Sequence, residues 1–118
     1  MNTVKNLQAM RYITDTLSEE ALLRQLAEES MELAHAALKA IRAYPDSDNP
    51  AGVDPGEAYI NLLEEVVDVA NAYTALTGDW GTMAHLSTMC RHSPKWKRWC
   101  KRVRKAQRKK QRCCRHDE

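Results

Sequence analysis

The sequence contains no phenylalanine, and aromatic residues make up only 6% of its 118 residues. Val, Ile and Thr are also few, whereas Ala, Leu, Glu, Lys and Arg are plentiful. Residues with β-branched or aromatic side chains favour strands, and the abundant types here are good helix formers. The composition therefore predicts an all-α fold.

Long apolar runs are missing as well. No stretch approaches the roughly eighteen apolar residues of a membrane span, and residues 1–17 lack the apolar run of a signal peptide. We expect a cytoplasmic protein without a membrane partner, in which thiols stay reduced. The sequence has four cysteines, Cys90, Cys100, Cys113 and Cys114. Their spacing matches no standard zinc knuckle, even when His92 and His116 are included, which fits the expectation of reduced thiols.

The net charge of +2 hides a strong asymmetry. Residues 91–118 hold thirteen Lys and Arg against two acids, a local charge of +11, whereas residues 1–90 carry a charge of −9. The chain thus consists of an acidic part followed by a basic tail. An acidic surface is either a metal site or a solvated face, and a basic tail attracts phosphate.

The length predicts one domain with a modest core, small enough to gain stability from oligomerisation. Helical periodicity is weak over residues 1–17 and strong from 18 to 43. A loop rich in Pro, Gly, Asp and Asn follows at 44–56, long enough to let the next helix pack antiparallel to the first. We expect further helices from Pro55 to about Leu76, at 79–91 and from Pro94 onward. The predicted domain is residues 1–112, with a disordered tail at 113–118 and fraying from about Lys110.

The ends of these helices have recognisable signals. Thr16 and Glu19 have capping-box spacing, and Ser18 is a competing N-cap for the same helix. The run Asp54-Pro55-Gly56-Glu57 is typical of a helix start, and Gly78 is typical of a helix end.

Two acidic clusters stand out because like charges at helical spacing repel one another. The first helix carries Glu28, Glu29 and Glu32, and the second carries Glu64, Glu65 and Asp68. Glu29 falls on the apolar ridge of its helix, where a carboxylate is costly unless something pairs with it. On antiparallel helices the two clusters could form a cage for a divalent cation, and hard oxygen ligands suit Mg²⁺.

The order Glu28-Glu29-x-x-Glu32, a spacer, and Glu65-x-x-Asp68 resembles the EExxE…ExxD pattern of MazG-like, all-α nucleoside triphosphate pyrophosphohydrolases. The likeness extends through QLAEESMELAHAALKAIRA and NLLEEVVDVANAY and covers roughly residues 18–104. The spacer is long because the loop at 44–56 is extended. A solvated helix face is the alternative interpretation, above all for Glu28 and Glu64.

The resemblance implies an antiparallel helical bundle that is completed by homo-oligomerisation, as a homodimer or homotetramer. It implies Mg²⁺-dependent hydrolysis of (deoxy)nucleoside triphosphates to monophosphate and pyrophosphate in nucleotide pool control, with Mn²⁺ as an alternative ion. By the motif match, Glu28 and Glu29 would be catalytic. The metal ligands would be Glu29, Glu32, Glu65 and Asp68.

Substrate-binding residues are predicted beside this motif and on the basic helix. Asn71, one turn after Asp68, could hydrogen-bond the sugar or a phosphate. Lys97, Arg98 and Lys101 could reach the triphosphate. The alternative function is a non-catalytic helical protein that binds nucleic acid non-specifically through the basic helix. Trp96 and Trp99, at i and i+3, are expected to pack in a core, with base stacking as the alternative.

Overall fold

The structure is a computed structural model that describes residues 3–116. These residues form helices and no strand, which confirms the all-α class. The helices are α1 (Thr3–Thr16), α2 (Glu19–Arg42), α3 (Pro55–Thr77), α4 (Gly81–His92) and α5 (Lys95–His116). None of the helices within 3–116 has the length and apolar content needed to cross a membrane.

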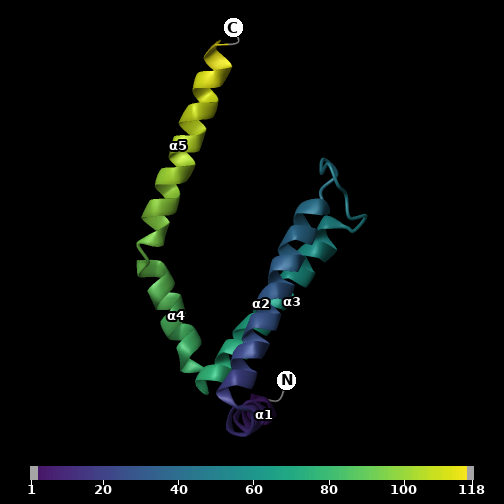
Figure 1. Cartoon of the computed structure of the whole chain (residues 1–118), viewed down its shortest axis with the longest axis vertical. Coiled ribbons are helices and arrows are strands. Elements are labelled where there is room, and N and C mark those ends of the chain that lie inside the picture. Colours follow the sequence, from purple (N-terminus) through teal and green to yellow (C-terminus); the bar gives the residue numbers. More distant parts are fainter. Residues whose placement is uncertain (1–2, 117–118) are drawn as a thin grey trace. The chain divides into compact units, whose positions relative to one another are not determined.

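The chain divides into two compact units, Met1–Met83 and Ala84–Glu118. In the first unit α2 and α3 lie side by side and antiparallel, joined by the loop that follows Arg42 (Figure 1). Helix α1 packs against α3. The antiparallel pairing predicted from the loop length is confirmed, whereas completion of a bundle by a second copy stays a prediction.

Local signals fix the ends of the two long helices. Ser18, rather than Thr16, caps α2, and its hydroxyl accepts a hydrogen bond from the Ala21 amide at 3.1 Å. Asp54 caps α3 in the same way through the Glu57 amide. Gly78 ends α3 with a φ of 68°, a conformation that costs glycine little.

A small core joins the three helices of the first unit. Its buried members include Met10 of α1, Leu22 and Ala36 of α2, and Ala58 and Ala72 of α3. The Thr14 hydroxyl donates a hydrogen bond of 2.7 Å to the Ala75 carbonyl and so ties α1 to α3. Small side chains at the α2–α3 contact let the helix axes approach closely, which places side chains of the two helices within reach of one another.

Several large apolar side chains of α3 stay exposed instead of packing in the core. Leu63, Val66 and Val67 are 46–55% exposed, whereas Ala58 and Ala72 are buried. The contact surface of α3 therefore includes positions that the sequence pattern places on its polar side, among them Glu65, which is half-buried.

In the second unit, α5 continues to His116, beyond the fraying expected from Lys110 and into the tail expected to be disordered. No Gly or Pro follows Pro94 in the sequence, so no residue there breaks the helix. The rest of the predicted tail, residues 117–118, lies outside the described residues. The prediction of one domain over 1–112 stays a prediction.

Candidate metal centre

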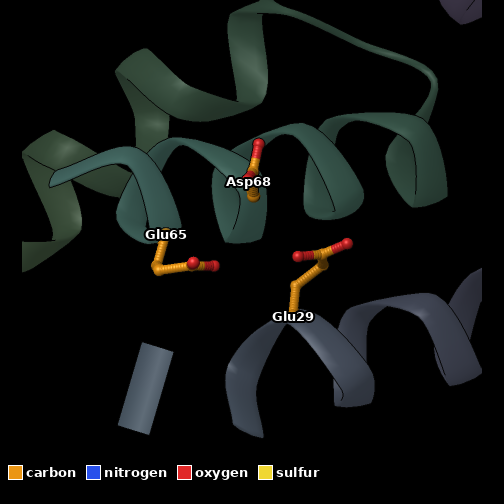
Figure 2. Close-up of side chains that lie close together, drawn as sticks. All are labelled: Glu29, Glu65 and Asp68. Carbon is orange, nitrogen blue, oxygen red and sulfur yellow. The ribbon is translucent and has the colours of Figure 1, made fainter. Parts of the chain in front are cut away.

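Three carboxylates from two helices meet in the first unit. Glu29 of α2 and Glu65 and Asp68 of α3 each offer an oxygen within 4.8 Å of the others. Figure 2 shows Glu29 rising from α2 towards α3, and Glu65 extending from α3 into the space between the helices. Glu65 and Asp68 are three residues apart, a spacing that brings side chains together on one helix face. The helix pairing supplies the third group.

Glu65 occupies the most unfavourable position of the three for a charge. Its Oε2 is buried and has no hydrogen-bond partner. Burial raises the pKa of Glu65, and the negative charges of Glu32, Asp68, Glu29 and Glu64 raise it further. All four charged groups that shift this pKa are acids, and no positive group of the described residues offsets them.

Glu29 is held in place from its own helix. The Gln25 side-chain amide, one turn earlier, donates a hydrogen bond of 2.6 Å to Glu29 Oε1. Glu29 is half-buried, as its place on the apolar ridge predicts. A fixed rotamer at a half-buried carboxylate is what a preorganised ligand requires.

A pocket of about 200 Å³ opens at Glu29 and Asp68. Asn71 and Gln25 also line it, together with apolar side chains of the three helices and of the link between α1 and α2: Ile13, Leu17, Leu22, Ala72 and Ala75. A second hollow of about 360 Å³ shares Ile13, Asn71 and Ala75 with the first and adds Asn6 and Trp80. Asn71 therefore lines both hollows.

The structure brings together three of the four predicted metal ligands. Glu32 is exposed and lies outside this close group, but its charge acts on Glu65. Glu28 is exposed on α2, beside Glu29 in the sequence. The substrate-binding residues predicted on the basic helix, Lys97, Arg98 and Lys101, are exposed on α5 in the second unit. Their contact with a substrate stays a prediction.

The donor set fits a hard divalent cation. It consists of carboxylate oxygens from two rigid helices, and one of these oxygens, Glu65 Oε2, is buried without a partner. Oxygen ligands are those that Mg²⁺ and Mn²⁺ prefer. A cation there would offset the mutual repulsion of the three carboxylates.

The cysteines take no part in this cluster. All four are free and exposed. Within the described part of the chain, no cysteine joins a histidine in a group able to hold a metal.

The structure adds residues that the sequence pattern did not single out. Gln25 is four residues before Glu29, and this helical spacing is a usable signal for their hydrogen bond. Ile13 of α1 and Leu17, which directly follows α1, line the pocket but carried no such signal, because only the packing of α1 on α3 brings them there.

Comparison with protein-family models, with curated proteins and with solved structures gave no match to this chain.

Proposed function

We propose that this protein is a metal-dependent nucleoside triphosphate pyrophosphohydrolase that acts in nucleotide pool control. The observation that carries the proposal is the meeting of Glu29, Glu65 and Asp68 across α2 and α3, with one buried oxygen that has no partner. The motif order that resembles MazG-like enzymes supports it. The reaction breaks the bridging bond between the α- and β-phosphates, adds the elements of water, and releases a monophosphate and pyrophosphate.

The ligands of the cation would be Glu29, Glu65 and Asp68, with Glu32 joining from the next turn of α2. When bound, Mg²⁺ or Mn²⁺ supplies positive charge that offsets the charge of the triphosphate and of the group that leaves. The carboxylates hold fixed positions because each lies on a helix and Glu29 is oriented by Gln25. Positioning of this kind is the main task of a protein in phosphoryl-transfer chemistry.

Glu28 has the role of orienting the attacking water and accepting its proton. It is exposed and adjoins Glu29 in the sequence, so it is free to face solvent or substrate. An ionised carboxylate is an acceptor only, which suits a group that takes a proton from water.

The nucleoside would lie towards the hollows beside the carboxylates. Asn71 lines both of them, and its amide offers both a donor and an acceptor to the sugar or a phosphate. The apolar walls of α1 and the Trp80 indole suit the flat face of a base. Lys97, Arg98 and Lys101 would add positive charge for the triphosphate.

Assembly into a homodimer or homotetramer forms part of the proposal. Exposed apolar side chains follow one stripe of α3 at Ile60, Leu63 and Val67, which are 47–58% exposed. Helix α2 carries a second exposed stripe with Leu23, Leu38 and Ile41. A second copy of the chain, placed over these stripes, would bury them and complete a bundle.

A pair of isosteric substitutions tests the site. Asp68→Asn is expected to reduce triphosphate turnover by at least about a hundredfold, because a neutral amide is a poor ligand for a hard cation. Glu64→Gln is the matched control, since Glu64 is exposed on the same helix and lies outside the close group. Circular dichroism should show equal helix content in both variants. Turnover of Asp68→Asn near that of the wild type would overturn the assignment.

A further inference from the structure

Helix α5 is the most strongly charged element of the molecule. Between Lys95 and Arg112 it carries eleven Lys and Arg, all of them exposed, and no acid occurs anywhere from residue 80 to residue 116. The triphosphate contacts proposed above use only Lys97, Arg98 and Lys101. The greater part of this charge therefore has no role in that function.

The basic side chains share one side of the helix. At 3.6 residues per turn, ten of the eleven fall within roughly half of its circumference, and only Lys110 falls elsewhere. Lys97, Lys101, Lys105 and Lys109 form one row at intervals of four residues, and Arg104, Arg108 and Arg112 form a second. Like charges at this spacing destabilise a helix. A polyanion laid against this side would remove the repulsion.

The side of α5 opposite the basic rows is aromatic near the start of the helix and lacks large apolar side chains further along. Trp96 and Trp99 stack with ring centroids 5.7 Å apart, and the Trp96 indole donates a hydrogen bond of 2.6 Å to the Cys90 carbonyl, which ties the start of α5 to α4. From Arg104 to Arg112 no apolar side chain is larger than that of Ala106. The two Trp side chains, expected to pack in a core, are instead 49–56% exposed, and Val103 is 47% exposed, so the exposed apolar side of α5 is confined to its first half. A lipid surface requires an apolar face to insert, and the stretch from Arg104 to Arg112 offers none. The ligand must be recognised there by charge.

We propose that α5 is a docking helix for double-stranded DNA, bound through its phosphates without regard to sequence. The helix of 22 residues is about 33 Å long, enough for a continuous basic helix to cross the major groove of B-DNA. Its diameter of about 10–12 Å matches a major groove about 12 Å wide, whereas the major groove of duplex RNA is too narrow. The two basic rows can then face phosphates on both edges of the groove.

The inference does not depend on the pyrophosphohydrolase proposal. Arg104, Arg108 and Arg112 lie outside the residues assigned to the triphosphate, so a variant of these three should bind DNA poorly while any triphosphate turnover is unchanged. Failure of one proposal therefore leaves the other open to test.

The test measures anisotropy of a labelled mixed-sequence duplex with the full chain at about 50 to 200 mM salt. If six side chains each neutralise one phosphate, log K should fall with log salt with a slope of about −5. The variant Arg104→Gln/Arg108→Gln/Arg112→Gln should weaken binding at least about tenfold and make the slope shallower by about 2 to 3. Circular dichroism should show that the variant keeps the helix content of the wild type.

The control variant Arg11→Gln/Arg24→Gln/Lys39→Gln removes the same charge from the first unit and should bind as the wild type does. Three outcomes would overturn the proposal. They are an equal loss of affinity in the control variant, binding that does not respond to salt, and tighter binding to duplex RNA, single strands or anionic phospholipid vesicles than to duplex DNA.

Discussion

Glu65 is the residue on which the proposed site depends most. The sequence marks it as one of three acids on a helix, but its environment comes from the fold. Its Oε2 is buried. The acidic groups that act on Glu65 come from α2 as well as from its own helix. Repulsion and burial disfavour its ionised form in the metal-free protein. Cation binding would reverse that preference, because a metal ligand must be deprotonated.

Divalent-cation binding is therefore expected to depend on pH through Glu65. Its pKa in the folded, metal-free protein lies above the ordinary 4.5, so the folded state holds this proton more tightly than the unfolded state does. Stability without metal should fall as pH rises from 4.5 through the raised pKa, whereas Mg²⁺ affinity should rise over the same window.

Calorimetric titration of Mg²⁺ in buffers with different ionisation enthalpies measures both the affinity and the proton released. Glu65→Gln should abolish the proton release, and Glu64→Gln should retain it. Tight Mg²⁺ binding with no proton release, at a pH within this window, would contradict the assigned role of Glu65.

Among the elements, α2 and α3 show how far local sequence determines structure. The boundaries of both helices follow from Ser18, Asp54 and Gly78, because caps act over a few residues. The side of α3 that contacts α2 cannot be predicted from the apolar pattern of α3. Apolar residues cover more of the surface of α3 than one partner helix can bury. Which apolar positions meet α2 depends on tertiary packing, and small residues such as Ala58 and Ala72 occupy that contact.

The end of α3 gives a stability prediction at this scale. Gly78→Ala should destabilise the protein because φ is 68° and the new Cβ would lie 3.2 Å from Thr14 Cγ2. Gly52→Ala has nearly the same φ, 69°, but no atom within 4 Å of its Cβ. Gly52→Ala should cost about 1–2 kcal/mol, the usual cost of left-handed backbone for a side chain.

Gly78→Ala should cost more than Gly52→Ala, because Thr14 must shift and its hydrogen bond to Ala75 is disturbed. Urea unfolding of the two variants measures the difference. An equal loss of stability would show that the approach of α1 to the end of α3 is less close than described.

For the whole molecule, the sequence alone predicts the all-α class, the antiparallel pair and the acidic cluster. The motif match, not the spacing alone, singles out Glu29, Glu32, Glu65 and Asp68 among the acids of the two helices, and three of these four lie close together in the structure. The contribution of α1 to the pocket was not predictable, since it arises from packing between residues about sixty positions apart, as with Thr14 and Ala75.

Self-association is the prediction that belongs to this scale. The wild type should be a homodimer or homotetramer in light scattering, because Ile60, Leu63 and Val67 form an exposed apolar stripe. Ile60→Gln/Val67→Gln should shift the protein towards monomer. Val4→Gln is the control, as Val4 is 65% exposed on α1, away from the stripe. A monomeric wild type would contradict this part of the proposal.

The central claim is that the paired acidic helices hydrolyse nucleoside triphosphates with a divalent cation. The most direct measurement is pyrophosphate and monophosphate release from a panel of standard and modified nucleoside triphosphates, with Mg²⁺ and with a chelator. The proposal predicts equal amounts of the two products with Mg²⁺ and none with chelator. No release from a folded protein across the panel with Mg²⁺ or Mn²⁺ would contradict it.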